Sequence, residues 1–315
     1  MTATCRICNT AADHSTYTVR EMMMGTGEPF VYFQCERCRC LQIAAFPPDM
    51  GKFYPADYYS FSTTSRDKTE NSAVKWFRKL RNHSSLSKAG IGSGAIRALF
   101  PNRKLLPLLR LGLNHDSRIL DVGCGSGWRL FALREAGFIN TLGVDPFIGS
   151  DIIYANGLQV LKRTVSEVEG TWDVIMFHHS LEHIPDQVAT LRATAGLLRP
   201  GGTCLIRVPI ASSYAWEFYR EYWYQLDAPR HFYLHSYESM KLLAEQCGLE
   251  LQSTECDSTL DQFRTSELYK RGFRTLKEAG FTRSQKNDWK RRAEDLNREG
   301  RGDQAVFYFG KAAAR

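Results

Sequence analysis

Short apolar runs alternate with amphipathic segments across residues 118–208. The runs at 118–122, 141–145 and 172–177 are rich in β-branched and aromatic residues, which is typical of buried strands. Residues 128–136 have the pattern of a helix, and a further strand is expected at 203–208 after a turn over 197–202. This alternation predicts an α/β domain built on a parallel sheet.

The two ends of the chain have different patterns. Residues 248–254 and 305–309 are predicted to be the last two strands, an antiparallel hairpin at the sheet edge, with the charged segment 265–298 inserted between them as a helical pair. Near the start, 16–19 and 30–33 have the pattern of short ribbon strands. We expect three regions, namely a ribbon at 1–50, an aromatic and basic helical linker at 51–114, and the main domain at 115–315.

The net charge of +7 is concentrated in one segment. Residues 71–115 contain nine Lys or Arg and no Asp or Glu, interleaved with bulky apolar residues such as Trp76 and Phe77. Helices of this composition suit an anionic membrane surface, an RNA or a phosphorylated substrate, and a solvated basic linker is the plain alternative. Nothing resembles a signal peptide or membrane span. We expect a cytoplasmic protein with peripheral contact at the inner membrane face and no DNA partner; the oligomeric state is left open.

Two C-x2-C pairs lie near the N-terminus, separated by 26 residues. Four thiolates at this spacing can close a tetrahedral zinc site with no open position, so a structural Zn²⁺ is expected to stabilise the small ribbon. Cys40, two residues beyond the second pair, is an alternative to the fourth ligand. The predicted metal ligands are Cys5, Cys8, Cys35 and Cys38.

A tyrosine-rich stretch follows the ribbon at residues 53–61. Tyrosines combine an apolar ring with a hydroxyl, which suits the wall of a pocket for a polar ligand. The stretch serves equally well to dock the ribbon on the main domain. The candidate ligand contacts are Tyr54, Tyr58 and Tyr59.

A glycine-rich turn joins the first predicted strand of the main domain to its helix. Its glycines let the backbone pass close to a ligand, and Asp145 ends the next strand, where a carboxylate can accept hydrogen bonds from both ribose hydroxyls. The third glycine comes two residues after the second, which departs from the dinucleotide fingerprint G-x-G-x-x-G. The candidate cofactor contacts here are Asp121, Gly123, Cys124, Gly125, Gly127, Asp145 and Pro146.

Together with Asp121 before the turn, this spacing resembles motif I of the class I S-adenosylmethionine-dependent methyltransferases. Asp145 resembles that family's ribose-binding acid, residues 172–175 resemble its fourth strand, and 197–208 resemble the turn into its fifth strand. The resemblance implies a Rossmann-like sheet of seven strands, with the last pair an antiparallel hairpin, and S-adenosylmethionine as cofactor. The acid that often holds the adenine amino group is missing at 162–164.

The sequence HHSLEHIPD at 178–186 contains H-x-x-E-H, a zinc-protease pattern that requires a helix. The strand before it and the proline after it instead predict a loop, with Asp186 capping a new helix at Gln187. In the resembled family this loop faces the cofactor and acceptor. The resemblance implies that His178 and His179 line the cofactor, partly through the backbone, and that His183 points toward the substrate; alternatively, Glu182 and His183 only brace the loop.

Seven aromatic residues lie between positions 214 and 224, within a predicted lid at 211–235. Aromatic side chains commonly stack on sugars, and ligands enter such folds at the carboxyl ends of the strands. The segment from Asp227 to His231 resembles bacterial polysaccharide and O-antigen methyltransferases, many of which begin with a cysteine ribbon; deoxysugar C-methyltransferases share the plan. Tyr222 and Arg230 are candidate acceptor contacts. Arg230 would bind an acceptor phosphate or pair with Asp227.

Methyl transfer from a sulfonium donor mainly requires alignment of the acceptor and uptake of its proton. His231 and His183 are therefore the candidate general bases. The hypothesis is methyl transfer to a sugar hydroxyl, or less favourably a sugar carbon, of a nucleotide-sugar or surface glycan. An RNA methyltransferase that binds RNA through the ribbon and basic segment is the alternative, and a non-catalytic scaffold is a third hypothesis.

Overall fold

The computed structural model describes residues 2–54, 60, 71–87, 91–273 and 275–312. These residues form two compact units that interleave along the chain. The ribbon unit comprises Met1–Pro55, His179–Arg192 and Ile206–Arg315. The glycine-turn unit comprises Ala56–His178 and Ala193–Leu205. Among the described residues, none of the helices combines the length and apolar character needed to cross a bilayer.

Parallel strands form the centre of the glycine-turn unit. β10 (Trp172–His178), β6 (Ile119–Val122), β7 (Thr141–Val144) and β9 (Gln159–Leu161) follow one another in the sheet, and β8 (Ile152–Ile153) pairs antiparallel with β9. All four residues of β6 are buried, as expected for a strand covered on both faces. The predicted strands at 118–122, 141–145 and 172–177 are thus confirmed.

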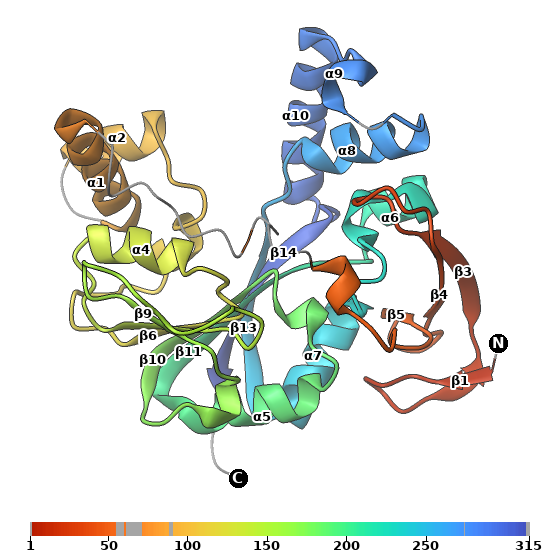
Figure 1. Cartoon of the computed structure of the whole chain (residues 1–315), viewed down its shortest axis with the longest axis horizontal. Helices are drawn as coiled ribbons and strands as arrows, with labels where there is room; N and C mark the ends of the chain where they lie inside the picture. The colour runs from red at the N-terminus through yellow and green to blue at the C-terminus, as the bar shows by residue number, and fades with distance from the viewer. Residues whose placement is uncertain (1, 55–59, 61–70, 88–90, 274, 313–315) are drawn as a thin grey trace. The chain divides into compact units, whose positions relative to one another are not determined.

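Helices flank this sheet. α4 (Trp128–Glu135) follows the glycine turn, and α1 (Ser72–Leu86), α2 (Ile91–Leu99) and the short α3 (Leu106–Leu109) precede the first strand. Figure 1 shows α1 and α2 beside α4. A buried ion pair joins them, because Arg78 of α1 donates from Nε to both carboxylate oxygens of Glu135 in α4 at 3.0 Å.

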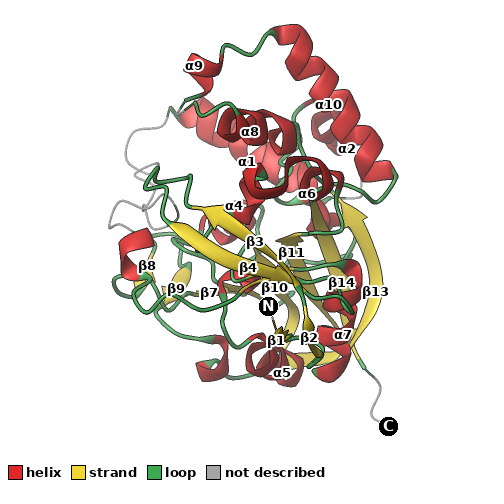
Figure 2. Cartoon of the chain, turned by 90° about the vertical axis from the view of Figure 1, so that its right-hand side faces the viewer, coloured by secondary structure: helices red, strands yellow, loops and turns green. Residues whose placement is uncertain are grey.

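The ribbon unit begins with a hairpin of β1 (Thr2–Thr4) and β2 (Ala11–Asp13). A second, antiparallel sheet has the order β12-β5-β4-β3, formed by β3 (Ser15–Arg20), β4 (Pro29–Gln34), β5 (Leu41–Ile43) and β12 (Tyr233–Leu234). The predicted ribbon strands correspond to β3 and β4, which Figure 2 shows side by side. Because β12 comes from the distant C-terminal part, the ribbon completes its sheet with a strand that the local sequence does not contain.

The rest of the ribbon unit is mainly helical around one strand pair. α7 (Tyr237–Gln246) precedes β13 (Leu249–Cys256), which pairs antiparallel with β14 (Gln304–Lys311) as predicted. The insertion between them contains three helices and not two, α8 (Asp261–Lys270), α9 (Leu276–Ala279) and α10 (Arg283–Arg298). The four-residue α9 was not predicted because a single turn leaves no periodic pattern to detect. Thr275 caps it through a hydrogen bond from Glu278.

Two strand predictions need correction. The central sheet has eight strands in the order β13-β14-β11-β10-β6-β7-β9-β8, not seven; the additional strand is the two-residue β8, which is too short to show alternation. The turn predicted at 197–202 lies mostly inside β11 (Leu198–Pro209), which directly follows α5 (Gln187–Leu197). Gly201 takes the left-handed φ of 74°, so the chain changes direction within the strand.

The H-x-x-E-H segment is not an α-helix. Leu181–His183 forms one 3-10 turn, η4, and His179 has a φ of 52° that no α-helical residue adopts. Asp186 caps α5 by accepting a hydrogen bond from the backbone N–H of Ala189 at 2.9 Å. The predicted loop and cap are confirmed. The part of the chain that the structure describes has four further 3-10 turns, η1 (Gly51–Phe53), η3 (Val165–Glu167), η5 (Arg220–Tyr222) and η6 (Tyr224–Leu226).

Candidate functional site

The glycine turn of the glycine-turn unit is tightly packed against one residue of the tyrosine-rich stretch. Gly125 has a φ of 56°, and a Cβ added there would lie 2.4 Å from the carbonyl oxygen of Ser60. The backbone N–H of Ser126 donates to that same oxygen at 2.9 Å. Only glycine fits at position 125, so the conformation of this turn depends on glycine there. Of the tyrosine-rich stretch, residues 55–59, with Tyr58 and Tyr59, lie outside the described residues.

Asp121, the third residue of β6, is a buried carboxylate close to the turn. Its Oδ2 accepts a hydrogen bond from Nη1 of Arg129 at 3.2 Å, while its Oδ1 has no hydrogen-bond partner among the described residues. Burial raises the pKa of Asp121 to about 6, although the Arg129 guanidinium opposes this rise. A cationic donor beside Oδ1 would satisfy this oxygen and favour the ionised carboxylate.

Asp145 follows β7 and lies against the same turn. Its Oδ2 accepts from the backbone N–H of Gly125 at 2.8 Å, and its Oδ1 accepts from Phe147 at 2.9 Å. A carboxylate oxygen can accept more than one hydrogen bond. The backbone N–H groups of Gly123 and Cys124 both donate to Val144, which holds the turn at the end of β7. Pro146 is exposed beside it, and Gly127 has a φ of 78°.

These residues suit S-adenosylmethionine, the cofactor that the sequence resemblance implies. That molecule carries an ammonium group and two ribose hydroxyls, all of them hydrogen-bond donors, and the turn presents the acceptors Asp121 and Asp145. His178, the last residue of β10, is buried in the same unit.

A second group of polar residues is buried in the ribbon unit, around Glu182. The side chain of Glu182 is fully buried, and its Oε1 lies 3.2 Å from Nδ1 of His179. Nη1 of Arg207 contacts Nε2 of the same imidazole, and Nε of Arg207 donates to Asp257 at 2.7 Å. Because the guanidinium can only donate, Nε2 of His179 must accept, and Nδ1 carries the proton donated to Glu182.

Glu182 remains ionised in this setting. Burial raises its pKa, but the hydrogen bond from His179 and the charges of His179, His231 and His183 outweigh that effect and lower it to about 2. Its Oε2 has no hydrogen-bond partner among the described residues. The group is therefore a buried anion that faces histidines.

His231 is buried between two carboxylates. Its Nδ1 donates to the backbone carbonyl of Gln225 at 2.7 Å, and its Nε2 lies 3.9 Å from Glu182 Oε1 and 3.7 Å from Asp227 Oδ2. A neutral ring held in this way has its lone pair on Nε2, the nitrogen that lies near both carboxylates.

Arg230 is fully buried and forms an ion pair with Asp227. Its Nε donates to Asp227 Oδ2 at 2.9 Å, its Nη2 contacts Oδ1, and the buried Glu21 lies 3.6 Å from Nη2. The Asp227 pairing, one of the two alternatives, is therefore observed. The other alternative, contact with an acceptor phosphate, stays a prediction that this complete burial disfavours.

His183 is half-buried beside His231. The two rings meet edge to face with their centroids 4.7 Å apart. Nδ1 of His183 lies 2.9 Å from the backbone carbonyl of Arg230 and 3.1 Å from the Tyr54 hydroxyl. Since the carbonyl only accepts, Nδ1 carries the proton and Nε2 is the basic nitrogen. Burial and the charge of His231 lower the pKa of His183, so the ring is neutral near pH 7.

The donor atoms of Glu182, His183 and His231 all lie within 4.8 Å of one another, a spacing that a divalent cation can bridge. Both imidazoles donate from Nδ1 to backbone carbonyls, so each presents a basic Nε2 in this cluster. We interpret the cluster as a proton-handling site.

The predicted aromatic lid is partly a hydrophobic core. Trp216, Tyr219 and Trp223 are buried; Trp216 packs edge to face on Tyr17 of β3 at 4.9 Å, and Trp223 Nε1 donates to Asp303 at 3.1 Å. These belong to α6 (Tyr214–Tyr219) and the turns after it. Tyr222 is half-buried. At least three of the seven aromatics therefore stabilise the fold.

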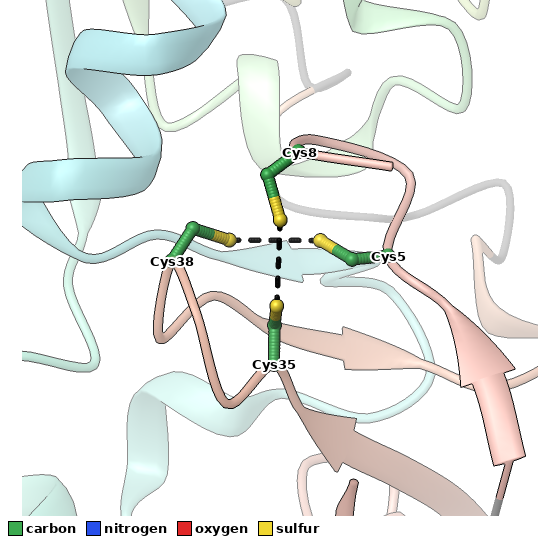
Figure 3. A group of neighbouring side chains, drawn as sticks. All are labelled: Cys5, Cys8, Cys35 and Cys38. Carbon is green, nitrogen blue, oxygen red and sulfur yellow. Dashed lines mark hydrogen bonds between the residues drawn. The ribbon is translucent and has the colours of Figure 1, made fainter. Parts of the chain in front are cut away.

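The four predicted metal-binding cysteines converge in the ribbon unit (Figure 3). Cys5 and Cys38 are 3.5 Å apart, as are Cys8 and Cys35. Tetrahedral Zn²⁺ with bonds of about 2.3 Å requires sulfurs roughly 3.8 Å apart, so the cluster has the right size. The Cys38 thiol and nearby backbone N–H groups hold the pKa of Cys5 well below its usual value. Cys40 instead contacts His235 Nδ1 at 4.0 Å, outside the cluster.

Several residues of the buried cluster were not predicted, namely Arg207, Asp257, Glu21 and Gln225. Arg207 lies in β11 and Asp257 just after β13, so strand topology alone brings them near His179. An arginine inside a strand of otherwise apolar residues, as in Leu205-Ile206-Arg207-Val208, is the signal that points to a buried partner.

Comparison with models of protein families gives a match to a long segment of the chain. A family model described as "Methyltransferase domain" matches residues 95–254, about half of the chain. The match includes the glycine turn, Asp145, the loop with Glu182 and His183, and His231.

Curated relatives match over shorter stretches. A ubiquinone biosynthesis O-methyltransferase of Xanthomonas campestris pv. campestris is 31% identical over 134 residues, covering 38% of this chain and 56% of the relative. One from Colwellia psychrerythraea is 33% identical over 101 residues, covering 28% and 40%. The chain thus spans about half the length of the curated relatives it matches.

Solved structures are similar at low identity. A mycolic acid cyclopropane synthase with bound S-adenosylhomocysteine has a TM-score of 0.46 and 17% identity over 75% of this chain and 98% of that one. A putative sarcosine dimethylglycine methyltransferase from Galdieria sulphuraria has a TM-score of 0.44 and 17% identity over 70% and 88%.

Proposed function

The chain belongs to the methyltransferase-domain family, and we propose that it transfers a methyl group from S-adenosylmethionine to a sugar hydroxyl of a nucleotide-sugar or surface glycan. The observation that carries this proposal is the pair of imidazoles whose Nδ1 protons are held by the backbone carbonyls of Arg230 and Gln225. Both rings thereby present a basic Nε2 beside buried carboxylates, as acceptor deprotonation requires.

The cofactor would be held by the glycine-turn unit. Asp145 would accept hydrogen bonds from the ribose hydroxyls. Asp121 would accept one from the ammonium group at its Oδ1, which has no hydrogen-bond partner among the described residues. When bound, S-adenosylmethionine supplies a methyl group already activated on a sulfonium sulfur. The protein therefore needs no group to activate the donor.

His183 is the proposed general base. The bound donor would supply the methyl group, and the acceptor hydroxyl would lose its proton to Nε2 of His183. His183 is better suited than His231, because it is half-buried and neutral near pH 7, whereas His231 lies buried between Glu182 and Asp227. His231 would position His183 through their edge-to-face contact, and the two carboxylates would stabilise the proton after transfer.

The sugar acceptor is inferred from the resemblance of residues 227–231 to polysaccharide methyltransferases and from the aromatic residues around them. Tyr54, 3.1 Å from His183 Nδ1, is a described aromatic that would contact the acceptor. O-methylation is preferred over C-methylation because the curated relatives are named O-methyltransferases. That name also favours a second acceptor class, an intermediate of ubiquinone biosynthesis.

The four-cysteine cluster is proposed to hold a structural Zn²⁺. Gln42 Nε2 donates to Cys5 Sγ at 2.9 Å and the backbone N–H of Ile7 donates to it at 3.4 Å, which are the outer contacts that stabilise a metal-bound thiolate. With four sulfur ligands and no open position, the ion would stabilise the ribbon and take no part in the reaction.

The proposal is tested with donor carrying a radiolabelled methyl group. Purified protein would be incubated with extract of a host that lacks this gene, and lipid-linked glycan, nucleotide-sugar, quinone and RNA fractions would be separated. Label in a carbohydrate fraction supports the sugar acceptor, and label in the quinone or RNA fraction replaces it. A His183→Ala variant should lose roughly a hundredfold or more of the labelling rate, whereas the control His83→Ala, an exposed histidine of α1, should retain it.

A further inference from the structure

Helix α1 is inverted relative to an ordinary surface helix. Its buried residues are Arg78, Asn82, Ser84 and Ser85, all of them polar. Arg78 and Asn82 bind Glu135 of α4, so the helix docks through an ion pair and hydrogen bonds. Val74, Trp76 and Phe77 of the same helix are exposed, which is the reverse of the pattern that burial in a protein core would produce.

The exposed apolar side chains of α1 adjoin those at the end of α2 through one pair of rings. Phe77 and Phe100 meet edge to face with centroids 5.4 Å apart. Trp76 is 65% exposed and Leu99 is 72% exposed. The aromatic patch consists of Val74, Trp76, Phe77, Leu99 and Phe100.

Exposed Lys and Arg side chains lie in the same segments of the chain as the aromatic patch. Lys79, Arg103 and Lys104 are exposed, and Lys104 lies 5.3 Å from the ring centroid of Trp128, which is itself exposed. Residues 71–115 contain nine Lys or Arg and no Asp or Glu. Exposed aromatics among cations are the combination that places a helix at the surface of an anionic bilayer.

We propose that α1 and the end of α2 form a peripheral docking surface for an anionic lipid bilayer, with the aromatic patch inserted among the headgroups. The proposal does not depend on which acceptor is methylated. Val74 and Leu99 favour a bilayer over RNA, because aliphatic side chains insert into lipid but do not stack on bases. A second copy of the chain is disfavoured because it would bring two cationic surfaces together.

The test is co-flotation of the full chain with vesicles of two compositions. One set is pure phosphatidylcholine and the other is equal parts phosphatidylglycerol and phosphatidylcholine. The proposal predicts flotation with the second set only, and release at high salt, because screening weakens the attraction of lysine and arginine to the headgroups. Equal binding to both sets, or binding to neither, would overturn it.

Two variants separate the apolar and the electrostatic contributions. Trp76→Ala should lower the partition coefficient about tenfold through lost apolar insertion, and Lys79→Glu/Arg103→Glu should lower it by about tenfold or more. The control Ile139→Ala removes an exposed apolar side chain elsewhere, and the control Lys277→Glu/Lys286→Glu makes the same charge change elsewhere. Both should float like the unchanged protein.

Competing occupants give distinct results. If the protein binds RNA but not vesicles, and Trp76→Ala weakens the RNA binding, the surface is assigned to RNA. A dimer in sedimentation that dissociates in Trp76→Ala would assign it to a second copy. Unchanged S-adenosylhomocysteine affinity in each variant confirms that the glycine-turn unit is folded, and flotation requires no acceptor, so the docking surface and the proposed function fail independently.

Discussion

His179 and Arg207 bind each other through both backbone and side chain. The His179 N–H donates to the Arg207 carbonyl at 2.8 Å, and the Arg207 guanidinium contacts His179 Nε2. This arrangement fixes the neutral tautomer of His179 that donates to Glu182. Arg207 thereby orients the carboxylate near His231, although Arg207 lies in β11 and no histidine of the cluster does.

Loss of Arg207 should weaken catalysis without affecting the cofactor. In Arg207→Met, His179 can rotate or change tautomer, so Glu182 loses a fixed donor and the cluster loses its geometry. We expect kcat to fall about tenfold and stability to fall by about 1–3 kcal/mol, with unchanged affinity for S-adenosylhomocysteine. Steady-state kinetics at several pH values and calorimetry check this. If only stability changes, with the pH profile intact, Arg207 has no positioning role.

The pH dependence of kcat/KM should report His183. Its pKa is lowered below the usual value of 6.5, mainly by burial, so the ring is neutral and competent at pH 7. Activity should therefore persist below pH 6.5 and decline only as the pH falls through the lowered pKa, when the ring becomes protonated. His183→Ala should abolish this acidic limb. If the acidic limb of the kcat/KM profile is unchanged in that variant, the limb reports the titration of another group.

Asp121→Asn should stabilise the apo protein while weakening cofactor binding. Because the pKa of Asp121 is about 6 in the folded protein and its ordinary value is 3.8, ionised Asp121 destabilises the fold above pH 6 by about 3 kcal/mol, and the effect disappears below pH 3.8. The variant should thus unfold at a higher temperature at pH 8 but not at pH 3.5. Its affinity for S-adenosylhomocysteine should fall about tenfold to a hundredfold. Unfolding at unchanged temperature at both pH values would contradict the burial argument.

Zinc binding should depend on Cys38 and not on Cys40. Replacing Cys38 with Ser removes a ligand from the four-sulfur cluster, so metal content should fall from one ion per chain and the ribbon should become protease-sensitive. Cys40→Ser, with its thiol near His235, should retain the ion. Elemental analysis of both variants tests which cysteine binds zinc, and equal metal loss in the two would refute the assignment of Cys38.

The sequence was sufficient for features that depend on local patterning. The glycine turn, the strand ending at Asp145 and the paired cysteines each have a spacing that only one local structure satisfies. β8 was too short to detect, and α9 is a single turn. The pairing of β12 with β5, and of Arg207 with His179, joins residues far apart in the chain, so no local pattern encodes it.

The aromatic lid shows a different limit of prediction from sequence. Seven aromatics in eleven residues predict a ligand surface or a core equally well, and composition does not separate the two. Burial of Trp216 and Trp223 against Tyr17 and Asp303 depends on the ribbon sheet and on β14, which are set by tertiary packing.

Calorimetric titration with S-adenosylhomocysteine tests the central claim most directly, because it needs no knowledge of the acceptor. The unchanged protein should bind one molecule per chain, Asp145→Ala should lose binding while it remains folded, and Glu169→Ala, an exposed acid of the same unit, should bind normally. Absence of binding by the unchanged protein, or retained affinity in Asp145→Ala, would contradict the assignment of this turn as the cofactor site.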